Sequence, residues 1–253
     1  MKRLNDIVGS KWILSKGLQE NGFMHRNYNW YTSMERALGF LLSGDLFITN
    51  GENWNDKDDG IVIKKRELYA KCFSCSTREN IAMWMLYGDK RGKNGALLNF
   101  YPSVIKEITN AETLLLGSFD EGKYIARYKI NNMSDYEIYL SDVLYVDYCK
   151  NDKVRLTCGD EHVVVNKEIL NHEDIFYKNY AWEYERECRL IVRLSEKWKK
   201  QASDEKLDTI CIKLSNEALT KMRKRDITRS PVYCGGAENG KKSILSGSIK
   251  WEL

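Results

Sequence analysis

Two glutamates separated by a single residue form the strongest chemical signal in the sequence. Residues 182–189 read WEYERECR and run directly into an apolar segment at 190–192. Because residues two apart on a strand share a face, Glu185, Glu187 and Arg189 are expected to point the same way. Neighbouring carboxylates oppose joint ionisation, so the pKa of one should rise, which suits acid/base catalysis or the stabilisation of a cationic intermediate. The alternative is a solvated strand entry in which Arg189 neutralises Glu187.

A second candidate is the Ser74-Cys75-Ser76 motif, which follows Cys72 and Phe73. On a strand, Ser74 and Ser76 would share one face, where their hydroxyls could orient a polar ligand. Shortly after it, Trp84 and Tyr87 lie three residues apart on a predicted helix, so their rings project together. Such a pair could stack on a flat ring or simply pack in the core.

Metal and nucleotide motifs are weak or missing. The Cys72-x-x-Cys75 spacing is half of a zinc knuckle, but the other cysteines form no second pair at ligand spacing, so we expect no metal site. The three histidines have no metal-type spacing, and no Ser or Cys stands in a nucleophile elbow. The sequence contains neither a P-loop nor a Gly-x-Gly-x-x-Gly turn. These patterns argue against zinc hydrolases, serine hydrolases and Rossmann dinucleotide sites.

The composition is that of a globular chain with a sizeable core. The 253 residues are 43% hydrophobic and 30% charged, with a formal net charge of +4 that permits an anionic partner without requiring one. No apolar run approaches the roughly 20 residues of a membrane span. The first residues include Asp6, Ser10 and Lys11 in place of an apolar core, and the seven cysteines are odd in number. We therefore expect a cytoplasmic protein with reduced thiols and no membrane association.

The elements that must position the candidate residues follow from capping signals and periodicity. Helices are expected at residues 32–44, 76–88, 171–180 and 216–225, the first two beginning with capping boxes at Thr32-Ser33-Met34-Glu35 and Ser76-Thr77-Arg78-Glu79. A polar loop is expected over 50–60. Strands are expected at 45–49, 68–76, 95–100, 124–130, 143–148, 154–157, 162–165, 187–194, 208–214, 232–234 and 244–251. Helices interleaved with many non-repeating strands predict one α+β domain over 1–253 with a mixed, mostly antiparallel core that could form two packed sheets.

Two basic runs could meet phosphates. The first lies near the C-terminal end of the chain and comprises Lys221, Arg223, Lys224, Arg225, Lys241 and Lys242. The second follows the helix predicted at 76–88 and comprises Lys90, Arg91 and Lys93. A solvated helix face is the favoured explanation, because no stacking aromatics are interleaved.

Several segments together resemble one bacterial family, known as domain of unknown function 2971. The matching pieces follow the family's order and span most of the chain: Tyr31 through Leu42, Gly44-Asp45-Leu46-Phe47, Trp54-Asn55-Asp56, Cys72-Phe73-Ser74, Met83-Trp84 with Tyr87, Gly95, Val146-Asp147-Tyr148 and Lys178 through Arg189. The Trp-x-Tyr-Glu-x-Glu-x-Arg piece is the most specific. The chain departs from the family at Lys57, where proline is usual, and between Tyr87 and Gly95, where a histidine is missing.

The order of these pieces is also similar to that of ADP-ribosyltransferases, above all the toxins that modify nucleic acids. The resemblance implies an ADP-ribosyltransferase-like domain that uses NAD as a substrate. It implies that Glu187 holds the nicotinamide ribose and stabilises the oxocarbenium-like charge, while Glu185 orients or deprotonates the acceptor. The NAD-contacting residues implied are Tyr31, Thr32, Ser74, Ser76, Trp84 and Tyr87.

The leading hypothesis is thus an intracellular toxin or phage-defence effector that transfers ADP-ribose to RNA, DNA or a protein. By the same analogy, an antitoxin protein would restrain it. A non-catalytic nucleic-acid-binding module is the first alternative, and it would bind with a steep salt dependence. A nuclease that uses Asp56, Asp58, Asp59 or the glutamates with Mg²⁺ is the second.

Overall fold

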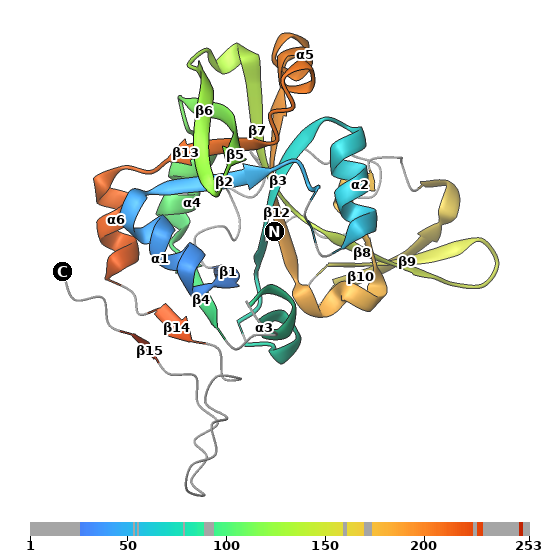
Figure 1. Cartoon of the computed structure of the whole chain (residues 1–253). Helices are drawn as coiled ribbons and strands as arrows, with labels where there is room; N and C mark the ends of the chain where they lie inside the picture. Colours follow the sequence, from blue (N-terminus) through green and yellow to red (C-terminus); the bar gives the residue numbers. More distant parts are fainter. Residues whose placement is uncertain are drawn as a thin grey trace, which may run out of the picture.

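The computed structural model describes residues 26–52, 54, 56–77, 79–88, 94–158, 161–169, 174–224, 227–229 and 248–249. Within these residues, strands and helices alternate in an α+β arrangement, as predicted (Figure 1). The strands form two sheets, one of eleven strands and one of four. Among the described residues, no helix combines the length and the apolar composition that a bilayer crossing requires.

The large sheet is organised around β3 (Leu68–Ser74). This strand pairs with β1 (Tyr28–Ser33), β2 (Asp45–Thr49) and β12 (Glu187–Leu194), all antiparallel. Beyond β1 the sheet continues through β4 (Gly95–Phe100) and β14 (Ile227–Arg229) to β15 (Ser248–Ile249). Beyond β2 it continues through β13 (Thr209–Lys213) and β5 (Leu114–Asp120) to β6 (Lys123–Ile130), and β7 (Tyr136–Asp142) pairs with β12. The candidate strands β1, β3 and β12 are therefore neighbours.

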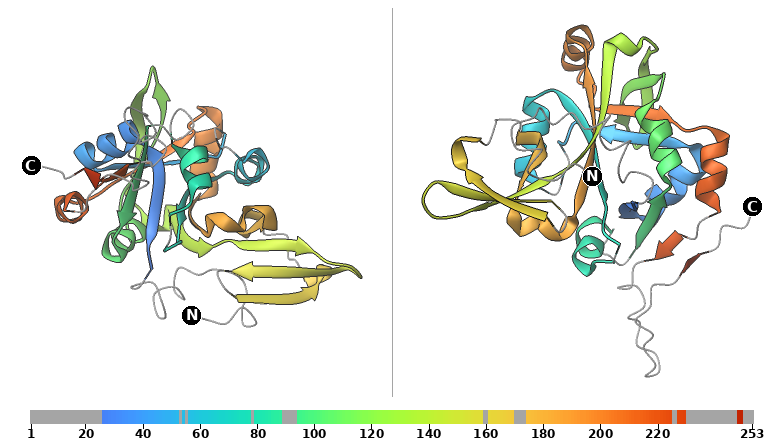
Figure 2. Two further views of the ribbon diagram at one scale, coloured as in Figure 1. Left: turned by 90° about the horizontal axis from the view of Figure 1, so that it is seen from below. Right: turned by 180° about the vertical axis from the view of Figure 1, so that it is seen from behind.

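The small sheet projects from the side of the molecule that carries helix α2 (Lys57–Lys65) (Figures 1 and 2). Its order is β10 (Glu161–Asn166), β9 (Lys153–Cys158), β8 (Leu144–Tyr148) and β11 (Tyr177–Asn179). It has an apolar core of its own, made by Leu144, Val146, Val154, Leu156 and Cys158. Only β11 pairs in parallel here, with β8, and it carries Lys178 toward the large sheet.

Three of the six described α-helices lie together beside the large sheet (Figure 1). Helices α1 (Met34–Ser43), α4 (Pro102–Thr109) and α6 (Asn216–Arg223) gather on the same side (Figure 1). Ser33 caps α1 by accepting a hydrogen bond from the Arg36 amide, and Gly44 ends it in a left-handed conformation with φ of 75°. An added Cβ at Gly44 would lie 2.8 Å from a Leu219 methyl, so the Leu219 side chain would have to move to accommodate it.

The strand predictions are largely confirmed. The structure has β2, β4 and β12 with the bounds expected, and β3, β6, β8, β9, β10 and β13 within one or two residues of them. The mostly antiparallel sheet and the second sheet are also confirmed. Eight of the described strands and α-helices were not expected from the sequence: β1, β5, β7, β11, β14, α2, α4 and α5 (Glu196–Asp204). The strands predicted at 232–234 and 244–251 lie outside the described residues, apart from 248–249.

Three predictions on the N-terminal half of the site were wrong in part. The expected polar loop over 50–60 ends in α2 (Lys57–Lys65), because the Asp56 side chain accepts from the amides of Asp58 and Asp59 and caps the helix. The predicted helix at 76–88 begins only at Ile81, as α3 (Ile81–Tyr87) with Asn80 as its N-cap. The first helix was expected to start at Thr32 or Ser33; Ser33 is confirmed as its N-cap, whereas Thr32 belongs to β1.

The helix predicted at 171–180 is absent from its described part. Residues 174–185 instead form the 3₁₀ helix η5 (Asp174–Phe176), strand β11, and a second 3₁₀ helix η6 (Tyr180–Glu185). Pairing of Tyr177, Lys178 and Asn179 with β8 overrides the helical spacing of the apolar residues. As a result, Lys178 sits on a strand and not on a helix.

Candidate active site

The sheet register brings the three predicted motifs to one place. Ser74, the last residue of β3, is paired with Asn29 of β1 on one side and with Glu187 of β12 on the other. Because directly paired residues of neighbouring strands share a face, Asn29, Ser74 and Glu187 lie on the same face of the sheet. Tyr31, two residues after Asn29, shares that face. Segments more than 40 and 110 residues apart along the chain therefore meet at one strand end.

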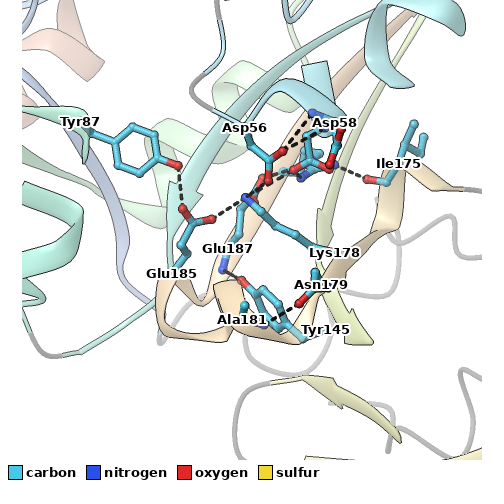
Figure 3. Close-up of polar contacts among 12 residues, drawn as sticks. Asp56, Asp58, Tyr87, Tyr145, Ile175, Lys178, Asn179, Ala181, Glu185 and Glu187 are labelled. Atoms are coloured by element: carbon cyan, nitrogen blue, oxygen red, sulfur yellow. Dashed lines mark hydrogen bonds and ion pairs between the residues drawn. The ribbon is translucent and has the colours of Figure 1, made fainter. Parts of the chain in front are cut away.

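Helix α3 packs over this face through its aromatic residues. Trp84 is completely buried, and its ring lies 5.0 Å from that of Tyr31 in an edge-to-face arrangement. The Tyr87 hydroxyl reaches further and donates a hydrogen bond of 2.7 Å to Oε1 of Glu185 (Figure 3). The two predicted aromatic residues therefore differ in role: Trp84 is packed in the core beside the site, and Tyr87 contacts a candidate catalytic residue directly.

The two glutamates converge, although they do not share a strand. Glu187 is the first residue of β12, whereas Glu185 is the last residue of η6, so the expectation of one continuous strand face is wrong. Arg186 between them adopts a left-handed conformation with φ of 43°, which turns the chain sharply. Both side chains nevertheless point toward Lys178 (Figure 3).

The Lys178 ammonium lies among four carboxylates. Its Nζ is 2.6 Å from Oε2 of Glu185, 3.2 Å from Oε2 of Glu187 and 3.3 Å from Oδ2 of Asp59. The fourth is Oδ2 of Asp56, at 3.8 Å. Lys178, Glu185 and Glu187 are all less than a tenth exposed, so these contacts are shielded from solvent.

Arg189 completes a charged cluster whose other members are Lys178, Asp56, Asp59, Glu185 and Glu187. Its guanidinium donates to Oε1 of Glu187 at 2.8 Å, to Oδ2 of Asp59 at 2.8 Å and to the carbonyl of Ile175 at 2.6 Å. The side chain is fully buried. The expected Arg189–Glu187 ion pair is therefore present, but it is buried and not at a solvated strand entry.

Burial and ion pairing shift the pKa values in different directions. For Glu187, burial alone would raise the pKa, but Arg189 and Lys178 hold it well below its usual range. For Glu185, burial outweighs Lys178 and, with the Glu187 charge beside it, raises the pKa. Burial likewise raises the pKa of Asp59 despite Arg189. The two glutamates are thus matched to different tasks: Glu187 stays ionised, and Glu185 accepts a proton more readily.

Backbone and thiol groups fix Glu187 further. Its amide donates to the hydroxyl of Tyr145 at 2.8 Å, and its carboxylate is in hydrogen-bond contact with Cys72. Tyr145 comes from β8 of the small sheet and Cys72 from β3 of the large one. Glu187 is therefore held by elements of both sheets.

The remaining predicted contact residues are less directly placed. Thr32 alternates with Tyr31 along β1, so its side chain points to the opposite face, which corrects its assignment to the site. Ser74 lies beside Glu187 and is 2% exposed. Ser76 follows the end of β3, and its carbonyl accepts a hydrogen bond from the Asn29 amide side chain at 2.8 Å. Asn29 was not predicted, because nothing in the sequence marked β1 as a strand.

Two residues of the basic C-terminal run, Lys221 and Arg223, are engaged within the protein. The Arg223 guanidinium donates to the Leu41 carbonyl at 2.7 and 2.9 Å, which caps the end of α1. Lys221 pairs with Glu217 on the same helix at 2.7 Å. These contacts favour the interpretation as a structural helix face. Arg225, Lys241, Lys242 and the run Lys90, Arg91 and Lys93 lie outside the described residues.

Comparison with known proteins bears on the part of the chain that carries this cluster. Residues 83–190 match a family described as Protein of unknown function (DUF2971). The matched segment runs from within α3 to within β12 and includes Tyr87, Lys178, Glu185, Glu187 and Arg189. The resemblance expected from the sequence is confirmed over this segment. No curated protein and no solved structure matches the chain.

Proposed function

We propose that the protein is an ADP-ribosyltransferase that uses NAD, with Glu187 at its catalytic centre. The observation that carries the proposal is the double pairing of Ser74, with Asn29 on one side and Glu187 on the other. The resemblance to ADP-ribosyltransferases requires its first segment, its serine motif and its final glutamate to act on one dinucleotide. Three adjacent strands with these residues on one face meet that requirement.

The proposed reaction breaks one bond and forms one. The bond between C1′ of the nicotinamide ribose and the ring nitrogen breaks, and its electron pair leaves with the nicotinamide, which becomes neutral. Glu187, which its neighbours keep ionised, stabilises the positive charge that develops on the ribose. A nucleophile of the acceptor then bonds to C1′, and its proton passes to Glu185, whose raised pKa suits a general base.

Lys178 and Tyr87 already engage the glutamates that this reaction needs. Lys178 lies 2.6 Å from Glu185 and 3.2 Å from Glu187, and Tyr87 bonds to the other oxygen of Glu185. The ammonium therefore occupies a position where a positive charge is stabilised by both carboxylates. NAD binding must exchange at least one of these contacts, and the developing ribosyl cation would take over part of the role of the Lys178 charge.

The charged cluster does not favour the nuclease alternative. Asp56 caps α2, and Asp59 is paired with both Arg189 and Lys178. Two cationic side chains thus already occupy the carboxylates that a Mg²⁺ ion would need. The acceptor remains RNA, DNA or a protein, and a toxin or phage-defence role with a restraining antitoxin belongs to the same proposal.

The decisive experiment measures nicotinamide release from NAD by the purified protein. Reactions contain no acceptor, bulk RNA, DNA or cell lysate, and the acceptor that accelerates release identifies the acceptor class. We expect Glu187→Gln to lose release by about 100-fold or more, the order expected for the loss of one electrostatic stabiliser. Glu217→Gln, an exposed glutamate on α6, is the matched control and should keep full activity.

Folding must be checked separately, because Glu187 is also an ion-pair partner of Arg189. Far-ultraviolet circular dichroism and thermal melting report whether each variant is folded. Glu185→Gln provides a second variant, since its amide can still accept a hydrogen bond from Lys178. A folded Glu187→Gln protein with wild-type release would overturn the proposal. So would folded wild-type protein without release under any condition, and salt-sensitive nucleic-acid binding without NAD would then favour the binding module.

A further inference from the structure

Behind Glu187, on the opposite face of the strand, three cysteines and an aspartate come together. Cys188 follows Glu187 on β12, Cys75 follows the end of β3, and Asp142 ends β7. One donor atom from each of these three residues lies within 4.8 Å of the other two. Cys158, at the end of β9, adds a fourth donor, with its Sγ 3.8 Å from Oδ2 of Asp142.

We propose that Cys75, Cys158, Cys188 and Asp142 bind a structural zinc ion. Three thiolates and one carboxylate form a ligand set suited to Zn²⁺, which prefers sulfur and nitrogen donors in a tetrahedral arrangement. With Zn–S distances of about 2.3 Å and Zn–O of about 2.0–2.2 Å, tetrahedral ligand atoms stand roughly 3.5–3.8 Å apart. The 3.8 Å separation of Cys158 and Asp142 agrees with this geometry. Cys158 lies outside the group of three whose donor atoms are all within 4.8 Å of one another, so its side chain must move toward Cys75 and Cys188 to complete the ligand set.

The surroundings already orient the aspartate as a ligand. Arg26 holds the Asp142 carboxylate with two contacts, Nη1 to Oδ2 at 2.9 Å and Nη2 to Oδ1 at 2.7 Å. Each carboxylate oxygen has two lone pairs. Oδ2 of Asp142 can therefore accept a hydrogen bond from Arg26 with one lone pair and coordinate a metal ion with the other. Metal ligands are commonly fixed by an outer hydrogen-bond partner of this kind. The guanidinium also offsets part of the negative charge of three thiolates and a carboxylate.

The backbone near the cluster is fixed as well. The Cys75 amide donates to the Arg186 carbonyl at 2.8 Å, and the Val143 amide donates to the Glu187 carbonyl at 3.1 Å. The ends of β3, β7 and β12 are therefore already joined, and Cys188 and Asp142 are buried. The Cys75 and Cys188 thiols are hydrogen bonded to each other. Zinc would replace that contact by two metal bonds and release the thiol protons.

The proposed ion would fasten the two sheets together directly behind the glutamate strand. Cys158 belongs to the small sheet, and Cys188 and Asp142 belong to the large one. This role is independent of NAD chemistry, because the thiols lie on the face of β12 opposite to Glu187. The Cys72-x-x-Cys75 spacing does not describe this cluster, since Cys72 contacts Glu187 on the other face and only Cys75 joins the cluster.

The test is the metal content of the full chain, purified without chelators from cells grown with added zinc. Mass-spectrometric metal analysis should find about one zinc ion per chain, the stoichiometry of a single structural site. Cys188→Ser and Cys158→Ser should lose it. Cys211→Ser, a buried cysteine on β13 away from the cluster, is the matched control and should retain it.

Two further measurements keep the proposal testable if the serine variants fail to fold. Asp142→Asn preserves the size of the side chain and should lower zinc occupancy while the protein stays folded. Wild-type protein depleted of zinc and loaded with Co²⁺ should show the visible absorption of a tetrahedral cobalt site with thiolate ligands. Wild-type protein with no zinc and no cobalt spectrum would overturn the proposal, as would a disulfide between Cys75 and Cys188. Zinc content does not depend on NAD turnover, so it can fail or succeed separately from the proposed activity.

Discussion

Two lysines, Lys178 buried and Lys71 half-buried, lie on opposite faces of the β3–β12 pair and behave in opposite ways. Lys178 reaches the Glu187 face and has four carboxylates within 3.8 Å of its ammonium. Burial would lower its pKa, but Glu187, Glu185 and Asp59 raise it above the usual lysine value. Lys71 is paired with Leu190 on the other face and lies over the Trp30 ring at 3.7 Å. Burial lowers its pKa to about 7.

The comparison shows that the environment, and not the residue type, decides what a buried charge does here. On the Glu187 face, opposite charges offset one another, so removing one leaves others unpaired. On the opposite face the Lys71 ammonium lies over the Trp30 ring, and the charge of Arg36 also opposes its protonation, so removing Lys71 relieves a cost. The predictions below test this difference, beginning with the largest expected effect.

Replacing Lys178 should be far more damaging than replacing Lys71. Lys178→Met leaves Glu185, Glu187 and Asp59 with one cation fewer in a buried site, which should cost about 3–5 kcal/mol of the free energy of unfolding. Lys71→Met should be neutral or stabilising at neutral pH, because methionine fits the stem and carries no charge. Urea denaturation followed by circular dichroism measures both. Equal effects of the two substitutions would contradict the comparison.

Arginines on one strand provide a second contrast. Arg189 is fully buried and joins Glu187, Asp59 and the Ile175 carbonyl. Arg193 lies four residues on, with its side chain 46% exposed and 3.8 Å from Glu137. Arg189→Met should cost about 3–5 kcal/mol, and Arg193→Met at most about 1 kcal/mol. The same denaturation experiment checks both, and high salt should reduce only the small Arg193 effect.

Removing one hydroxyl should have a smaller effect on stability. Tyr87→Phe deletes the hydrogen bond to Glu185 but keeps the ring packed against the apolar cluster that includes Tyr31 and Trp84. A charged partner makes the bond worth about 1.5–3 kcal/mol, of which Lys178 can recover part by holding Glu185 alone. Thermal melting measures the loss. Tyr148→Phe, on an exposed tyrosine of β8, is the control and should leave the melting temperature unchanged.

The last expected effect is a pH dependence of stability that originates at Lys71. Its pKa falls from 10.5 to about 7 on folding, so the unfolded chain binds more protons than the folded one between these values. Stability should therefore rise with pH from about 7 toward 10.5. Lys71→Met should flatten this rise in urea denaturation at a series of pH values. Wild-type and variant curves that stay parallel would show that Lys71 does not titrate in this range.

Local signals predicted the elements of the site better than they predicted its contacts. Glu187 begins β12 where the apolar run begins, and Gly44 ends α1 as expected. The polar residues at 50–60 concealed α2, although Asp56 as an N-cap with acids in the first turn is a recognisable helix start. The sequence therefore contained a signal from which α2 could have been predicted.

The contacts themselves depend on pairings that no local pattern specifies. Nothing near Asp59 indicates Arg189, which is 130 residues away, and nothing near Lys178 indicates four acidic partners. The meeting of Cys75, Cys158, Cys188 and Asp142 likewise arises from four strand ends and follows no ligand spacing. Convergence of this kind is set by sheet order and register, which the sequence alone did not reveal.

The span of the charged cluster along the chain has a consequence for folding kinetics. Its members come from α2, β11, η6 and β12, so they meet only after both sheets have formed, whereas the β8–β9 and β9–β10 hairpins involve neighbouring segments. Contacts between distant segments carry a larger loop-closure cost and tend to form late. We therefore expect substitutions in the cluster to accelerate unfolding and to leave the refolding rate nearly unchanged. The cluster would then determine the lifetime of the native state by setting its unfolding rate.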